Sequence, residues 1–181
     1  MQIPSLISKA KHVKLLILDV DGILTDGVLY FGDTKEYMKA FHVHDGLGLR
    51  LLLSTNVSIA IITAKQSCIV TTRLQALGIT DIHQGVQDKL AIYNQLLTKY
   101  HLSAKEVAFM GDDLPDLQTL KTCGLSISVP NAYWVIKRHV DMITQKDGGA
   151  GAVREVCDFI MQAKGTFNAA LAPFEAITAH D

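Results

Sequence analysis

The feature that most constrains the fold is a short apolar run that ends in two acidic residues. Residues Leu15 to Leu18 are all apolar, and Asp19 and Asp21 follow directly. A continuous apolar run of this length is typical of a strand buried on both faces, as in a parallel sheet. Gly22 then allows the chain to turn away. The pattern predicts that both carboxylates lie at the carboxyl end of a central strand, where open α/β sheets bind their ligands.

Asp19 and Asp21 are so close in sequence that their negative charges repel each other unless a cation binds between them. A hard divalent cation with oxygen ligands is the natural candidate. The alternative, which this stretch alone leaves open, is a strand that ends in a solvated, Asp-rich turn.

Predicted strands and helices alternate along most of the chain. The strands are expected at 14–18, 57–62, 79–83, 107–110, 125–129 and 140–144, and the helices at 4–10, 46–55, 67–77, 87–100, 114–122, 131–138 and 152–163. This alternation favours a doubly wound, largely parallel, Rossmann-like α/β sheet. Asp45 is expected to cap the helix at 46–55. We expect one domain over 1–181, with part of 165–181 disordered because that segment shows no clear period.

A second pattern lies outside this alternation. Residues 27–31 and 36–41 are rich in aromatic and β-forming residues and flank the Gly-containing stretch 32–35, which predicts a β-hairpin. An apolar hairpin that the core does not need is a candidate subunit interface. The alternative, that the hairpin folds onto its own domain, stays open.

Composition narrows the classes of function. The chain has 181 residues, 49% of them hydrophobic, and a net charge of -1, which gives no electrostatic case for nucleic acid. Its three cysteines form no Cys-x-x-Cys pair, so neither a disulfide framework nor a zinc site is suggested, and reduced thiols in a cytoplasm are expected. No apolar run approaches the roughly 20 residues that span a bilayer, and the first residues lack the apolar core of a signal peptide.

Polar side chains follow three of the predicted strands. Besides the first pair of acids, Thr63 follows the strand at 57–62, and Asp112 and Asp113 follow the strand at 107–110. Lys89 lies near the start of the helix between them. The carboxyl ends of parallel strands meet at one edge, so these groups should converge on one crevice. Such a set suits Mg²⁺-assisted phosphoryl transfer, although Thr63 alone would more often be a helix cap and Lys89 alone an exposed lysine.

Together these motifs resemble those of the haloacid dehalogenase (HAD) superfamily. They are Asp-x-Asp-Gly-x-x-Thr at 19–25, Thr63 after an apolar strand, Lys89, and Gly-Asp-Asp-x-x-Asp at 111–116. Residues 40–48 and 148–155 further resemble the 3-deoxy-D-manno-octulosonate 8-phosphate (KDO 8-phosphate) phosphatase family. The resemblance covers residues 12–164.

The resemblance implies a role for each matched residue. Asp19 would be the nucleophile that becomes an aspartyl phosphate, and Asp21 would protonate the leaving sugar oxygen and then activate water. Thr63 and Lys89 would hold the phosphoryl oxygens. The Asp19 side chain, the backbone carbonyl of Asp21 and the Asp112 side chain would hold Mg²⁺.

Two further acids of the last motif would support this set. The resemblance implies that Asp113 orients metal-bound water or Lys89, and that Asp116 stabilises the loop and its helix start. The reaction implied is hydrolysis of KDO 8-phosphate in lipopolysaccharide precursor synthesis, in the cytoplasm.

Substrate contacts implied by the resemblance, beyond Asp21 and Lys89, fall on Asp45, Gly46, Arg50 and Arg73. The two arginines could pair with a sugar-acid carboxylate, although each alone would be read as a surface residue. The chain departs from the family at three places. His42 stands where the family usually has Asn, and His44 where it often has Arg. Ala64-Lys65 replaces the usual Gly-Arg. Lysine lacks the two-pronged geometry of arginine, which leaves the sugar open.

The spacing of the motifs leaves no room for a separate cap domain, so the crevice should be open to water. The resemblance implies a homotetramer, assembled through the hairpins, in which the segment 148–154 closes a neighbouring site. The alternative is that this segment simply starts the last helix. Alternative functions are a phosphatase for another sugar acid such as a nonulosonate 9-phosphate, a tetramerisation module of a sialic-acid synthetase, or a phospho-accepting receiver domain.

Overall fold

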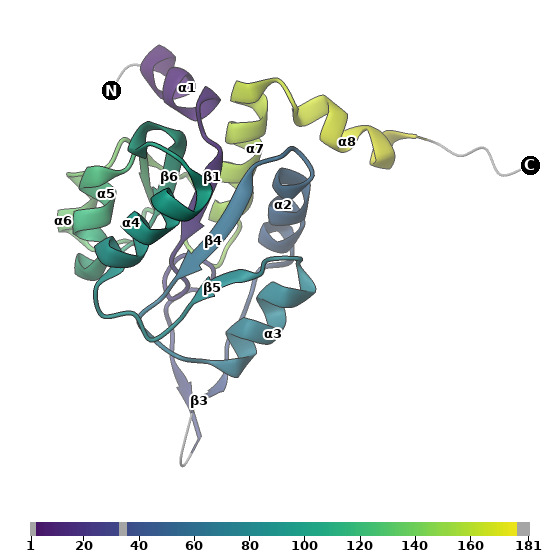
Figure 1. Cartoon of the computed structure of the whole chain (residues 1–181). Coiled ribbons are helices and arrows are strands. Elements are labelled where there is room, and N and C mark those ends of the chain that lie inside the picture. Colours follow the sequence, from purple (N-terminus) through teal and green to yellow (C-terminus); the bar gives the residue numbers. More distant parts are fainter. Residues whose placement is uncertain (1–2, 33–35, 177–181) are drawn as a thin grey trace, which may run out of the picture.

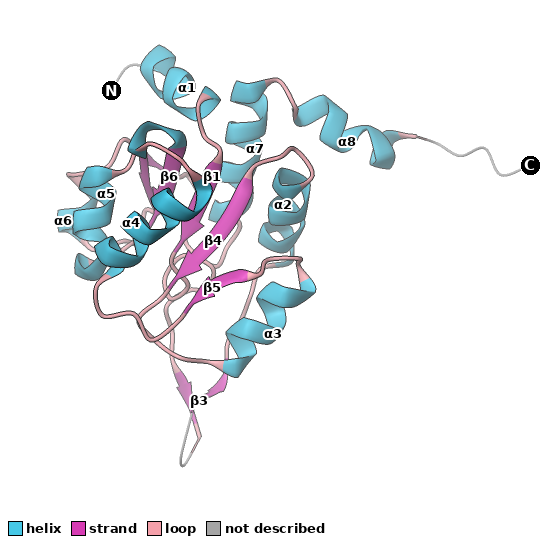
Figure 2. Cartoon of the chain, in the orientation of Figure 1, coloured by secondary structure: helices cyan, strands magenta, loops and turns pink. Residues whose placement is uncertain are grey.

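A sheet of six parallel strands, in the order β5-β4-β1-β6-β7-β8, organises the chain. The coordinates are a computed structural model that describes residues 3–32 and 36–176. Figures 1 and 2 show the sheet between two layers of helices. Its strands are β1 (Leu15–Leu18), β4 (Ser58–Ile62), β5 (Asp81–His83), β6 (Val107–Met110), β7 (Leu125–Ser128) and β8 (Met142–Ile143). The predicted doubly wound α/β sheet is confirmed.

Strand β1 lies in the middle of the sheet, and all four of its residues are buried. Leu15 pairs with Ser58 of β4 on one side and with Val107 of β6 on the other. From β1 the chain moves outward to β4 and β5, then returns to β6 and moves outward the other way. The order of the strands therefore reverses between β1 and β6, which is where sheets of this kind form a ligand crevice.

The helices cover both faces of the sheet (Figure 1). They are α1 (Ile3–Lys11), α2 (Val43–Leu53), α3 (Cys68–Ala76), α4 (Lys89–Tyr100), α5 (Leu117–Thr122), α6 (Trp134–Lys137), α7 (Ala152–Lys164) and α8 (Phe167–Glu175), with short 3-10 turns at Ala104–Glu106 and Leu114–Asp116. Leu16 and Leu18 of β1 face the core beneath α2 and α7, whereas Leu15 and Ile17 face the core beneath α4. None of the described helices is long and apolar enough to cross a membrane.

The expected cap at Asp45 is wrong. Helix α2 begins at Val43, three residues before the predicted start, with His42 at its N-cap. Asp45 lies buried in the first turn, and its Oδ1 accepts a hydrogen bond of 2.7 Å from the backbone N–H of Arg154. The carboxylate therefore caps the first turn of α7, an element more than a hundred residues away in sequence.

Other boundaries also differ. Residues 131–133 form a turn, so that α6 begins only at Trp134, although a helix was expected from 131. The segment after 165, where no period was visible, contains α8 with Pro173 inside it. Residues 177–181 of that segment lie outside the described residues.

The predicted hairpin consists of the short antiparallel strands β2 (Tyr30–Phe31) and β3 (Glu36–Met38). It projects from the molecule, away from the central sheet, at the bottom of Figure 1. Residues 33–35 of its turn lie outside the described part. Among its described side chains, the large exposed apolar ones are Val28, Leu29, Tyr30, Phe31 and Met38.

Candidate active site

Asp19 stands at the end of β1, where the sheet holds it in place. Its backbone N–H donates a 3.0 Å hydrogen bond to the carbonyl of Met110 at the end of β6. Gly22 follows with a φ of 86°, and a Cβ built there would lie 2.2 Å from Oδ2 of Asp112. Only glycine therefore allows the carboxylates of the two loops to approach each other.

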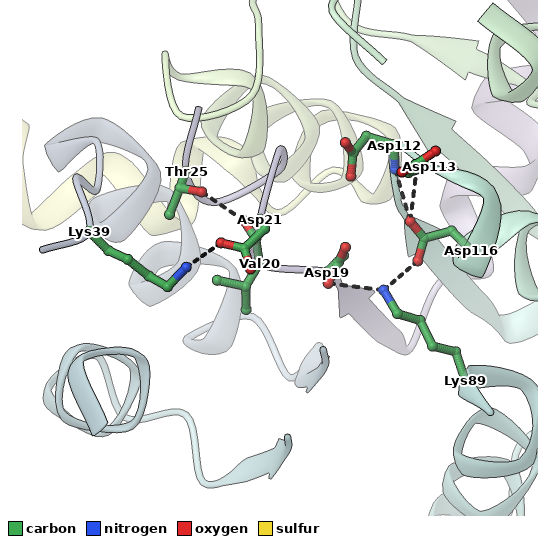
Figure 3. A network of polar contacts seen from close by, with 9 residues as sticks. All are labelled: Asp19, Val20, Asp21, Thr25, Lys39, Lys89, Asp112, Asp113 and Asp116. Carbon is green, nitrogen blue, oxygen red and sulfur yellow. Dashed lines mark hydrogen bonds and ion pairs between the residues drawn. The ribbon is translucent and has the colours of Figure 1, made fainter. Parts of the chain in front are cut away.

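Lys89 links the two acidic loops (Figure 3). It is the first residue of α4 and is 3% exposed. Its Nζ lies 3.0 Å from Oδ1 of Asp19 and 2.7 Å from Oδ1 of Asp116. Burial alone opposes a charged lysine, but the two carboxylates outweigh it and raise the pKa of Lys89, which stays an ammonium.

Asp116 holds the second loop in shape. Its Oδ2 accepts hydrogen bonds of 3.1 Å and 3.2 Å from the backbone N–H groups of Asp112 and Asp113. Asp113 in turn accepts a hydrogen bond from the N–H of Leu114. The prediction that Asp116 stabilises the loop and its helix start agrees with this geometry.

The carboxylates at this edge fit a divalent cation. One oxygen each of Asp19, Asp112 and Asp116 lies within 4.8 Å of the other two. Both oxygens of Asp116 already have donors, whereas the buried Oδ1 of Asp112 has no hydrogen-bond partner within the described residues. Such an orphaned oxygen is costly unless a ligand satisfies it. Asp19 and Asp112 are therefore the side chains best suited to hold Mg²⁺, as expected from the sequence.

The charge states of Asp19 and Asp112 depend on whether a cation is bound. Burial first, and the neighbouring Asp116 second, raise the pKa of Asp19 to about 7. Burial, followed by repulsion from Asp19 and Asp116, raises the pKa of Asp112 to about 8. A bound divalent cation would lower both pKa values again, because it stabilises the two carboxylates.

An open crevice of about 240 Å³ connects these groups. It is lined by the predicted residues Asp19, Asp21, Thr63, Lys89, Asp112, Asp113 and Asp116, together with Lys65. Thr63 directly follows β4 and is buried. The convergence expected from the strand ends is thus present, and Ala64 and Lys65, which depart from the family pattern, also line the crevice.

Sequence reasoning missed Lys39, which lies just after β3 at the base of the hairpin. Its Nζ forms an ion pair with Oδ1 of Asp21 (Figure 3). The Lys39 side chain is 1% exposed, whereas that of Asp21 is 22% exposed. No motif marks the lysine, because the contact joins a hairpin strand to a loop 18 residues earlier.

The substrate contacts implied by the resemblance form a second group. Asp45, Gly46 and Arg73 line a separate narrow cavity with His42. A Cβ at Gly46 would lie 2.4 Å from Nη2 of Arg73, so glycine is needed for the arginine to lie there. Arg50 is exposed on α2. Within one chain the structure therefore does not bring these residues into the crevice.

The Gly-rich segment packs on its own chain. The N–H of Gly149 donates to the carbonyl of Ile23 at 3.0 Å, and the N–H of Gly148 donates to Oδ1 of Asn131 at 3.1 Å. A Cβ at Gly148 would lie 1.7 Å from the carbonyl oxygen of Gly22. Within one chain the segment thus leads into α7 and supports the turn after Asp21; whether it also closes a neighbouring site stays a prediction.

The fold and the acidic site are those of a haloacid dehalogenase-like hydrolase, and the profile of that family matches residues 56–156. The 3-deoxy-D-manno-octulosonate 8-phosphate phosphatase of Escherichia coli K12 is 43% identical over 164 residues, which are 91% of this chain and 87% of that protein. The chain therefore belongs to the family of 3-deoxy-D-manno-octulosonate 8-phosphate phosphatases within the haloacid dehalogenase-like hydrolases.

Solved structures agree with this assignment. The Moraxella catarrhalis 3-deoxy-D-manno-octulosonate 8-phosphate phosphatase, in complex with magnesium ion, phosphate ion and KDO, is 43% identical. Its TM-score is 0.93, over 96% of this chain and 100% of that one. The cobalt-bound form of the Haemophilus influenzae phosphatase is 36% identical, with a TM-score of 0.86 over 89% of this chain and 94% of that one.

Proposed function

We propose that the protein is a Mg²⁺-dependent phosphomonoesterase that hydrolyses KDO 8-phosphate to the free sugar acid and phosphate. One observation carries the proposal: the Asp19 carboxylate lies 3.0 Å from the Lys89 ammonium, beside the orphaned oxygen of Asp112. A nucleophile, a cation for the phosphoryl group and a carboxylate oxygen suited to bind a metal thus meet in one crevice. The names of the relatives support the choice of sugar phosphate.

In the first step an oxygen of Asp19 forms a bond to phosphorus, and the bond from phosphorus to the sugar oxygen breaks. The electron pair of the broken bond stays on that oxygen, which takes a proton from the carboxyl group of Asp21. Lys89 and the hydroxyl of Thr63 hold the other phosphoryl oxygens in place. The products are the free sugar acid and an aspartyl phosphate.

In the second step Asp21 works in reverse. Its carboxylate removes a proton from a water molecule, whose oxygen forms a bond to phosphorus while the bond to Asp19 breaks. Inorganic phosphate leaves, and Asp19 regains its carboxylate. Acid–base assistance of this kind contributes a factor of about 10² to 10⁴ to a rate.

Asp19, the backbone carbonyl of Asp21 and Asp112 would hold the Mg²⁺ ion. When bound, the ion would offset the repulsion between the Asp19 carboxylate and the phosphate dianion. Asp113 would orient metal-bound water, and Asp116 keeps Lys89 and the loop in register.

The open crevice and the second group of residues support an assembly. We propose a homotetramer, built through the hairpins, in which neighbouring subunits cover each site. Arg50 and Arg73 would then contact the sugar acid across such an interface. The buried Asp45 and Gly46 would support this contact by fixing the start of α7 and leaving room for the Arg73 side chain. We place the reaction in the cytoplasm, in lipopolysaccharide precursor synthesis.

The direct test is a substrate screen with purified protein, ranked by kcat/KM. We expect KDO 8-phosphate to exceed other phosphorylated sugars and a nonulosonate 9-phosphate, and we expect turnover to stop with a chelator and return with Mg²⁺. A higher kcat/KM for the nonulosonate ester would overturn the choice of substrate. A stable phosphoprotein without continued phosphate release would instead indicate a receiver domain.

A further inference from the structure

We propose that Lys39 is a positioning residue that holds Asp21 in the orientation needed to protonate the leaving group. This inference rests on the proposed function, in which Asp21 is the acid and base. It adds to that site a residue from the hairpin, which the catalytic motifs do not include.

The environment of the pair carries the argument. The Lys39 side chain is almost wholly buried, and an ammonium in that position is costly unless a carboxylate compensates it. Asp21 supplies that carboxylate through Oδ1. Within the described residues no other hydrogen bond to the Asp21 side chain is formed, so Lys39 is what selects its rotamer.

The two lysines of the site pair with different carboxylates. Figure 3 shows Lys89 directed at Asp19 and Asp116, and Lys39 directed at Asp21 from the opposite side. Because Lys39 engages Oδ1, Oδ2 of Asp21 is the oxygen available to the substrate. The nucleophile and the acid are therefore held by different lysines, and loss of Lys39 should affect the acid more than the nucleophile.

Two substrates with different leaving groups can distinguish a defect in Asp21 from a defect in Asp19. A sugar alkoxide is a poor leaving group and needs a proton as the bond to phosphorus breaks, whereas p-nitrophenolate leaves without one. A displaced Asp21 should slow release of the sugar and spare release of nitrophenolate. A general structural defect, or damage to Asp19, would slow both.

The test measures leaving-group release in a single turnover, so that the later attack by water does not contribute. In Lys39→Met we expect release of the sugar acid from KDO 8-phosphate to fall about 10- to 100-fold, within the range of acid–base catalysis. Release of p-nitrophenolate from its phosphate ester should fall less than about threefold. Affinity for Mg²⁺, measured by calorimetry, should stay within a few-fold, because Lys39 pairs with the side chain of Asp21, whereas the ion would use the backbone carbonyl of that residue.

Lys9→Met is the matched control, because Lys9 forms an ion pair with Asp141 away from the crevice. It should leave both rates unchanged. Equal losses on the two esters in Lys39→Met, or no loss on either, would overturn the inference. If Lys39→Met does not fold, Lys39→Gln carries the same expectation. Failure of the proposed function itself would appear separately, as absence of turnover in the unaltered protein.

Discussion

At Asp19 the proposed nucleophile, a lysine and two further acids line one crevice. Lys89 lies between Asp19 and Asp116, while Asp112 has an oxygen without a donor among the described residues. The site therefore holds more negative charge than its own lysine compensates. This imbalance is the physical basis for the metal requirement and for two predictions at this scale.

Asp19→Asn should abolish turnover and leave the protein folded. The amide cannot attack phosphorus, and loss of a nucleophile typically costs a factor of about 10⁴ or more. The metal-free protein should not be destabilised, because the change removes repulsion with Asp112. Steady-state kinetics and thermal melting measure the two effects. An Asn variant with a near-normal rate would remove the nucleophile assignment.

Affinity for Mg²⁺ should fall as pH is lowered from about 8.5 to about 6. Burial raises the pKa of Asp19 to about 7 and that of Asp112 to about 8 in the metal-free protein. At lower pH more of these carboxyl groups carry a proton, which the metal must displace, so that binding weakens. Calorimetry in buffers of different ionisation enthalpy reports both the affinity and the protons released. An affinity that is flat over this range would contradict the raised pKa values.

At the scale of elements, the sequence predicts best what local pattern determines. The apolar run at Leu15 to Leu18 specifies a buried central strand, and the acids after it lie at the sheet edge because parallel strands end there together. What it cannot reveal are contacts between distant elements. The Asp45 carboxylate caps α7 instead of its own helix, and Lys39 reaches Asp21 from the hairpin. The sequence around Asp45 and around Lys39 contains no pattern that predicts these partners.

The Gly-rich segment offers a test at the same scale. In Gly148→Ala the added Cβ would overlap the carbonyl of Gly22, so the turn that carries Asp21 must shift. We expect a loss of about 1–3 kcal/mol in the free energy of unfolding, with a fall in kcat. Denaturant titration and steady-state kinetics measure these quantities. Ala150→Ser, at an exposed position two residues on, should change neither the stability nor kcat. A fully active, stable Gly148→Ala would show that the segment can shift without disturbing the turn that carries Asp21.

For the whole molecule, the hairpin matters because it presents several large apolar side chains to solvent, as a subunit interface would. Phe31 at its end is 69% exposed and Tyr30 is 39% exposed. Replacing both by Ser should weaken the proposed tetramer, because its interface would lose two aromatic side chains. Light scattering or sedimentation should then report a smaller mass than for the unaltered protein. Phe174→Ser, which removes an exposed aromatic from α8, is the control. An unchanged mass in the hairpin variant would dismiss the hairpin as the interface.

The position of β1 has a consequence for biosynthesis. Leu15 needs Ser58 on one side and Val107 on the other. After β1 has left the ribosome, most of the remaining chain must therefore be translated before β1 can pair with β6, its second neighbour. Until then a wholly apolar segment has an open edge that other nascent chains can pair with. We expect slow, late completion of the sheet, and dependence on chaperones at high expression, because Asp19 follows a strand in the middle of the sheet.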